Sequence, residues 1–178
     1  LVGAVTTTIN ADFAVNRGPA GGANNRLRLF GGFDLAGGER TVSLGRYTNN
    51  PAAVLGSGSE SLKFETVADG PVTTFTNGTL RFVRDATGGA GDYASVRFES
   101  GTGVFNGNSG LVIGSNVITV LPSGFVFGTF GERPDIEVEA GGYLNLSDQA
   151  NARDAAIEGL SGEGTVTSLA SATDTATL

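Results

Sequence analysis

The feature that most constrains this chain is a series of short apolar doublets between Asn77 and Gly128, each made of two apolar residues that flank one other residue. The doublets are separated by glycine, asparagine and serine, and they occupy Leu80–Phe82, Val96–Phe98, Leu111–Ile113, Ile118–Val120 and Phe125–Phe127. Successive side chains of an extended chain point to opposite faces, so each doublet directs two apolar groups to one side. A strand this short is not stable alone. We therefore expect many short strands to stack on one another.

Two all-β architectures remain, a sandwich and a solenoid. A sandwich needs longer strands with sustained alternation of apolar and polar residues. Here most doublets end after two apolar residues, which indicates a corner every few residues. Only Gln149–Ile157 is compatible with a helical turn. The pattern therefore predicts one all-β domain over residues 1–178, built as a β-solenoid of parallel strands with open ends.

The spacing of the doublets suggests the size of each coil. They recur every 15 to 18 residues, beginning at Leu62, Leu80, Val96 and Leu111. We expect rungs of roughly 18 to 25 residues, about seven to nine coils and a body roughly 35–45 Å long, at about 4.8 Å per coil. An internal stack of aromatic rings, formed by Phe64, Phe82 and Phe98, is also expected.

Composition excludes several functional classes. The chain has 29 glycines and 5 prolines, which indicates many tight corners. Its net charge of −7 and pI of about 4.5 disfavour binding to nucleic acid or to anionic membrane surfaces. Cysteine and histidine are absent, so disulfides, thiolate metal sites and Ser-His-Asp triads are excluded. Because no apolar run approaches about 18 residues, no membrane insertion is expected.

Four segments resemble the passenger repeats of autotransporter-type bacterial surface proteins. They are Leu27–Leu44, Thr76–Phe82, Gly141–Leu146 and Ile157–Val166, with Leu-Gly-Gly-like turns, an Asn-Gly-Thr-Leu strand start, a Gly-x-Leu-x-Leu element and a Leu-Ser-Gly-x-Gly-Thr-Val element. The resemblance implies a right-handed parallel β-helix that is secreted and displayed at the cell surface. The family's passengers are mostly stalks and adhesins, and the resemblance supplies no catalytic residues. The chain departs from the family in lacking a C-terminal β-barrel translocator.

Three carboxylates form the candidate metal site. Asp135, Glu137 and Glu139 alternate with apolar residues and should share one outer strand face, about 7 Å apart. Together with Glu132 they would offer oxygen ligands of the kind that Ca²⁺ prefers. The alternative is a solvated strand face that is kept charged against aggregation. No other cofactor is expected.

Three functions are compatible with this sequence. The favoured one is a non-enzymatic, extracellular structural or adhesive element of a bacterial surface, with glycans or another cell surface as possible contacts. The first alternative is a fibre subunit that self-associates end to end, because the terminal rungs lack polar or helical caps and either a longer chain or another copy should continue the coil. The second is a carbohydrate-active β-helix that would use the mixture of acidic and basic residues formed by Arg81, Arg84, Asp85, Asp92, Arg97 and Glu99.

Overall fold

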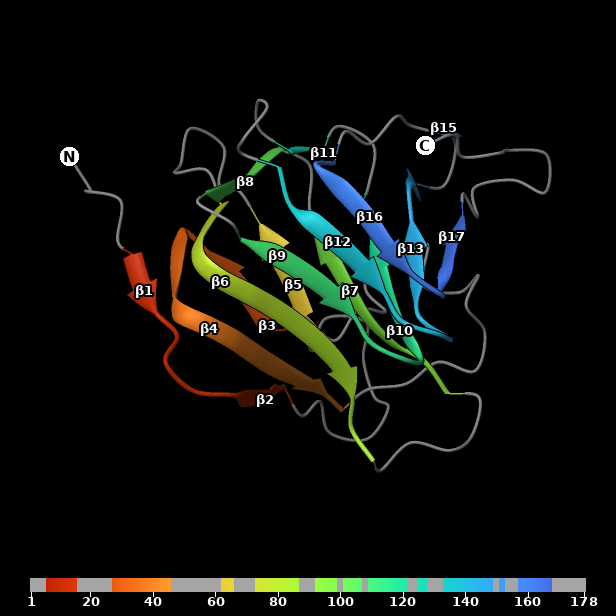
Figure 1. The fold of residues 1–178 in the computed structure, drawn as a ribbon, viewed down its shortest axis with the longest axis horizontal. Coiled ribbons are helices and arrows are strands. Elements are labelled where there is room, and N and C mark those ends of the chain that lie inside the picture. Colours follow the sequence, from red (N-terminus) through yellow and green to blue (C-terminus); the bar gives the residue numbers. More distant parts are fainter. Residues whose placement is uncertain are drawn as a thin grey trace.

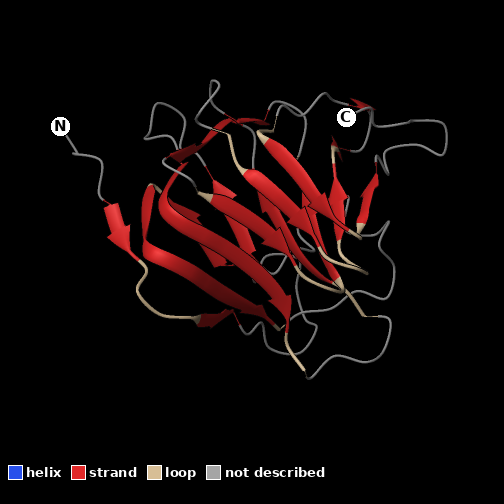
Figure 2. Ribbon diagram, in the orientation of Figure 1, coloured by secondary structure: helices blue, strands red, loops and turns tan. Residues whose placement is uncertain are grey.

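The computed structural model of this chain is built of strands. It describes residues 6–15, 27–45, 62–65, 73–86, 92–98, 101–106, 109–121, 125–127, 133–148, 151–152 and 157–167. These residues contain no helix (Figure 2), and hence no helix that is long and apolar enough to cross a membrane. The predicted all-β class is confirmed. The segment Gln149–Ile157 falls mostly outside the described residues, and its described part at 151–152 is a strand.

Two parallel sheets make up nearly all of the described structure (Figure 1). The nine-stranded sheet contains β1 (Thr6–Thr8), β2 (Phe13–Val15), β4 (Gly32–Leu44), β6 (Thr73–Arg84), β8 (Gly101–Asn106), β9 (Gly110–Ile113), β11 (Phe125–Phe127), β12 (Asp135–Val138) and β16 (Gly159–Gly162). The six-stranded sheet contains β3 (Leu27–Phe30), β5 (Leu62–Glu65), β7 (Ala94–Phe98), β10 (Val117–Val120), β13 (Tyr143–Asn145) and β17 (Thr165–Thr167). A separate antiparallel pair joins β14 (Ser147–Asp148) to β15 (Asn151–Ala152).

The nine-stranded sheet consists of two columns of stacked strands. The first column holds β1, β8, β11 and the first parts of β4 and β6. The second column holds β2, β9, β12, β16 and the last parts of β4 and β6. The two long strands run through both columns, and their register shifts between Asp34 and Gly38, where the sheet bends. The six-stranded sheet is the third column.

The pairing of strands corrects the predicted coil length. In the first half of the chain Leu27 is paired with Leu62, and Phe33 is paired with Phe75. Both intervals clearly exceed the length that we predicted for one rung, so that prediction is wrong for this half. Towards the C-terminus the coils become shorter, and the interval from Leu144 to Val166 lies within the predicted range. The doublets at Leu62 and Leu80 belong to facing sheets, so the short interval between doublets measured the step from one sheet to the other.

The core lies between the two sheets and is formed by inward rows of aligned side chains. One row of the second column runs from Val42 through Phe82 and Ile113 to Val138, and all four side chains are buried. Parallel pairing in register stacks equivalent positions, so each apolar residue contacts another one rung away. The second column has six strands within the described part of the chain, fewer than the number of coils expected.

Aromatic rings form two ladders inside this core. Phe64 and Phe98 stack in the third column with ring centroids 5.0 Å apart, as predicted. The expected third member, Phe82, comes from the facing sheet and lies tilted, 6.1 Å from Phe64. The other ladder, which the sequence analysis missed, runs through Phe33, Phe75 and Phe105 with centroid separations of 5.5 and 4.7 Å.

Left-handed backbone conformations make the corner between the first two columns. Ala36 and Gly37 have φ of 55° and 75°, and Asn77 has φ of 57° one rung later. A Cβ on Gly78 would lie 2.2 Å from the carbonyl oxygen of Gly38, so only glycine fits where these corners stack. Asn77 also donates a hydrogen bond to the Asp34 carboxylate. The Asn-Gly pair thus forms a stacked corner instead of a hairpin.

The outer faces of the two sheets differ in exposure. On the third column the outward side chains of Ile118 and Val120 are fully buried and pack against Tyr93 and Tyr143. The outward side chain of Arg97 is also buried, with 4% exposed. On the second column the outward residues Asp135 and Glu137 are exposed. The second column therefore offers a polar sheet surface that solvent can reach, unlike the third column.

Candidate functional site

The candidate site is the outer face of the second column, where two outward rows cross neighbouring strands in register. The first row is Glu39, Thr79, Gly110, Asp135 and Gly159, and the second is Thr41, Arg81, Val112, Glu137 and Ser161. Parallel register places each row across the sheet at nearly constant height along the strands. The face therefore combines carboxylates, hydroxyl groups, one guanidinium and one apolar side chain.

Arg81 links side chains from three parts of this face. Its Nε donates to Glu39 Oε1 at 2.8 Å, and its Nη1 donates to Glu139 Oε1. Glu39 lies on the neighbouring strand β4, whereas Glu139 follows β12 on the far side of β9. These charge-assisted bonds raise the pKa of Arg81 above its ordinary value, and the hydrogen bond to Glu139 is the largest cause. Arg81 thus connects the neighbouring strand β4 and the residue after β12, two strands away, across the outer face.

Gly114 lies beside the Glu139 carboxylate on the outer face. Its amide donates to the Phe82 carbonyl oxygen at 2.9 Å. A Cβ placed on Gly114 would lie 3.4 Å from Glu139 Oε2 and 2.6 Å from that carbonyl oxygen. Any residue with a Cβ at this position would therefore force the backbone to shift, and its Cβ would touch the Glu139 carboxylate.

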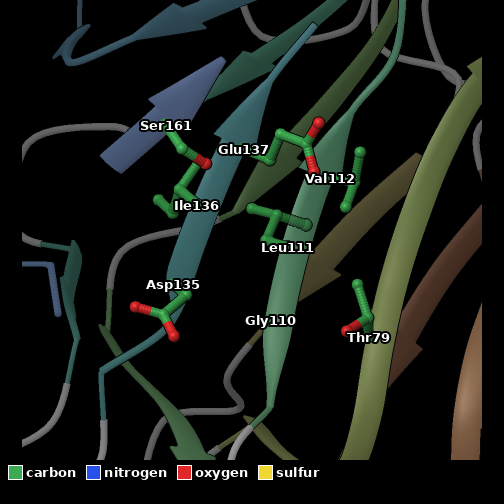
Figure 3. A pocket seen from close by; sticks show the side chains of 8 residues that line it. All are labelled: Thr79, Gly110, Leu111, Val112, Asp135, Ile136, Glu137 and Ser161. Carbon is green, nitrogen blue, oxygen red and sulfur yellow. The ribbon is translucent and has the colours of Figure 1, made fainter. Parts of the chain in front are cut away.

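A shallow hollow of about 160 Å³ lies beside this ion-pair group, over β9. Figure 3 shows Gly110 between Thr79 on one side and Asp135 on the other. Gly110 carries no side chain, so the hollow forms between its two row neighbours. The lining is completed by Leu111, Val112, Ile136, Glu137 and Ser161. The hollow can offer hydroxyl and carboxylate acceptors above an apolar floor at Val112.

The three carboxylates of the predicted calcium site do not converge. Asp135 and Glu137 project from β12 and are exposed, but Glu139 is held by Arg81. Within the described ranges, no group of three or more acidic, histidine or cysteine side chains is close enough to hold a metal ion. Glu132, the proposed fourth ligand, lies outside these ranges. The calcium site with Glu132, and its alternative of a charged, solvated strand face, therefore both stay predictions.

The acidic and basic residues considered for carbohydrate chemistry are divided between the two sheets. Arg81 is engaged on the outer face of β6, whereas Arg97 is buried on β7. Arg84 donates to the backbone carbonyl oxygen of Asp92 at 3.3 Å. Glu99 lies outside the described residues. The structure therefore does not bring Arg81 and Arg97 to one common groove.

Sequence reasoning missed the hollow and the partners of Arg81. The sequence does contain glycine at 110 and 114, on either side of the apolar doublet Leu111–Ile113. Which outward residues flank these glycines on the neighbouring strands depends on the register of strand pairing, and the sequence alone does not give that register. Comparisons of this chain found no matching protein-family model, no matching curated protein and no matching solved structure.

Proposed function

We propose that this chain is a non-enzymatic, extracellular structural or adhesive element built as a right-handed parallel β-helix. The observation that supports this most directly is the order in which the chain visits the three columns. After β3 in the third column, β4 passes through the first and second columns, and β5 returns to the third. The strands β6 and β7, β8 to β10 and β11 to β13 repeat the same order. A repeated cyclic order, with every pairing inside the three columns parallel, is what a three-sided coil requires.

The handedness follows from general behaviour of parallel strands. Connections between parallel strands of one sheet are right-handed in about 98% of cases, because a twisted strand packs back onto its sheet in that way. Display at a bacterial surface is favoured by the four segments similar to autotransporter-type passenger repeats. The acidic sequence and its lack of cysteine fit such a location without being specific to it.

The contact surface of such an element is the outer face of the second column. A scaffold that binds other surfaces needs an exposed, rigid, polar face, and strands hold side chains more precisely than loops. The exposed carboxylates of Asp135 and Glu137 can accept hydrogen bonds from a ligand, Val112 lines the floor of the hollow beside them, and Arg81 bonds to Glu39 and Glu139 on other strands. Sugar hydroxyls are the class of group that such carboxylates bind.

Two measurements test the proposal. Antibodies against the purified chain should label intact cells of the source organism or its culture medium, and labelling only after permeabilisation would overturn surface display. A panel of polysaccharides and glycans should show binding without product release. Sustained release of oligosaccharides by the purified chain would contradict the non-enzymatic role.

A pair of charge-matched variants tests the contact face. Glu137→Lys, on the second column, should abolish any glycan binding found in the panel. Thr8→Lys introduces the same group on the exposed strand β1 of the first column and should leave that binding intact. Equal binding by both variants would place the contact elsewhere.

A further inference from the structure

We propose that Tyr93 and Tyr143 form a site of oxidative cross-linking, at which a one-electron oxidant of the peroxidase class joins the two rings of one chain as dityrosine. The rings meet on the outer face of the third column, with centroids 5.4 Å apart and an interplanar angle of 79°. Their hydroxyl groups are hydrogen-bonded to each other. This inference does not depend on what the outer face of the second column binds.

Strand register brings the two tyrosines together from distant parts of the chain. Tyr143 is paired with Ile118 of β10, and Ile118 is paired with Ser95 of β7. Tyr93 precedes Ser95 by two residues, so its side chain is directed to the same outer face. Because β10 lies between β7 and β13 in this sheet, the two rings meet over β10.

Apolar packing holds the two rings in place. Ile118 and Val120 are fully buried and form a cluster with Tyr93 and Tyr143 on this face. Two phenols that are already held in contact react far more readily than two that must first meet in solution. Both rings are only partly buried, so an oxidant in solution can reach them.

The reaction joins one ring carbon of each tyrosine. Each phenol gives up one electron and one proton, which leaves two phenoxyl radicals with unpaired electron density on the ring carbons beside the oxygen. One such carbon from each ring forms the new carbon–carbon bond, and the hydrogen atom on each of these carbons then moves to the phenolic oxygen. With hydrogen peroxide as the final oxidant, the two electrons and two protons convert one peroxide molecule into two water molecules.

The arrangement of the two rings suits this bond. Because the hydroxyl groups are within hydrogen-bond distance, the ring carbons beside them are neighbours as well. The two rings of a biphenol are twisted about the bond that joins them, so an interplanar angle of 79° is compatible with coupling. The rings have only to move closer together, and the broad χ2 well of tyrosine allows such an adjustment.

The new bond would connect β13 to the residue before β7, across the intervening β10. It would close a loop of roughly 50 residues, and a covalent link of this kind restricts the unfolded chain far more than the folded one. The linked chain should therefore unfold at a higher temperature than the unlinked chain.

The test exposes the purified chain, at low concentration, to a haem peroxidase and hydrogen peroxide. The product should show the blue fluorescence of dityrosine and keep the mass of a single chain, less two hydrogen atoms. Peptide mapping should join the peptide that holds Tyr93 to the peptide that holds Tyr143. The thermal midpoint of this product should exceed that of the untreated chain.

The chain has three tyrosines, so single variants can assign the link. Tyr93→Phe and Tyr143→Phe keep the aromatic ring, and each should lose all of the intrachain product. Tyr47→Phe is the matched control and should retain the product in full; Tyr47 lies outside the described residues. The peptide map of the parent identifies the linked residues even if a variant fails to fold.

Three outcomes would overturn the inference. They are a parent chain that stays unlinked under conditions that couple free tyrosine, a link that maps to Tyr47, and intrachain product that persists in Tyr93→Phe. Products that join only separate chains would also contradict it, because they would show that the two rings do not meet within one chain. None of these results bears on surface labelling or glycan binding, so the proposed function is tested separately.

Discussion

Arg81 on β6 donates a hydrogen bond to the carboxylate of Glu139, which follows β12, although β9 lies between these two strands. Gly114, which has no side chain, lies beside the Glu139 carboxylate. The bond explains why Glu139 is not available to a metal site. It also shows that outer-face contacts in this protein connect rungs that are not adjacent in their sheet.

Replacement of Arg81 tests how much this bridge stabilises the fold. Arg81→Gln should lower the free energy of unfolding by about 0.5–1 kcal/mol, because the ion pairs are partly exposed and screened by solvent. The loss should shrink at high salt. Urea unfolding of the single variants Arg81→Gln and Glu139→Gln and of the double variant measures the coupling. Strictly additive losses would show that the pair contributes nothing.

Phe75 tests the aromatic ladder that the structure revealed. Its ring stacks on Phe33 and Phe105 and contacts Phe64 and Phe98 edge-on, and the side chain is fully buried. Phe75→Ala should cost about 3–5 kcal/mol, since the cavity would remove contacts on several rungs. Phe75→Leu should cost less because it refills part of that volume. A loss below about 1 kcal/mol for the alanine variant, in chemical denaturation, would contradict this packing.

A substitution at Thr119 should stabilise the fold, in contrast to those at Arg81 and Phe75. It lies in the inward row between Val96 and Leu144, is fully buried, and its hydroxyl has no hydrogen-bond partner among the described residues. A buried hydroxyl without a partner costs free energy, and valine has nearly the same shape. Thr119→Val should therefore raise stability by about 1 kcal/mol. Thr119→Ser, which keeps the hydroxyl and removes a methyl group, should lower it in the same assay.

Ala36 tests the corner conformation. It is an exposed alanine with φ of 55°, a left-handed conformation that costs residues with a Cβ about 1–2 kcal/mol. Ala36→Gly and Ala36→Asn should each raise the thermal midpoint, because glycine and asparagine tolerate this region. Ala36→Val is the control and should lower the midpoint. An unchanged midpoint in all three variants would show that this corner is not left-handed in solution.

The tyrosine pair on the third column makes stability fall at alkaline pH. The rings of Tyr93 and Tyr143 meet edge-on with centroids 5.4 Å apart. The hydrogen bond to Tyr143, aided by burial, raises the pKa of Tyr93 above its ordinary value of 10.0. The folded state therefore holds the Tyr93 proton more tightly than the unfolded state does. The resulting contribution to the free energy of unfolding is fully present below about pH 10 and is lost as pH rises through the raised pKa.

This dependence is measured as the urea midpoint from about pH 9 upward. The parent should lose stability across this range, and Tyr93→Phe should show a smaller loss because it has no proton to release at that position. The phenolate absorbance that is lost in Tyr93→Phe should appear at a higher pH than that of free tyrosine. If the urea midpoints of the parent and of Tyr93→Phe fall equally steeply with pH, the tyrosine pair does not cause the loss of stability.

Local patterns predicted the class of fold and the parallel stacking of short strands. Alternation within doublets such as Leu80–Phe82 determines which side chains point inward, since it depends on neighbouring residues alone. It also correctly predicted that Asp135 and Glu137 face outward. The same pattern led to a wrong rung length. Doublets of facing sheets look alike in the sequence, so the spacing between them is not the length of a rung, and the loops between them vary in length.

Register was the quantity that local patterns could not supply. Whether Phe82 stacks on Phe64 or on Ile113 depends on which residues lie opposite each other across dozens of positions. The same holds for Arg81, whose partners Glu39 and Glu139 lie 42 and 58 residues away. The amino-acid sequence by itself determined an all-β chain with apolar rows and glycine corners. Only the tertiary structure decided which face stays exposed, because burial depends on every segment that packs against a sheet and not on the strand alone.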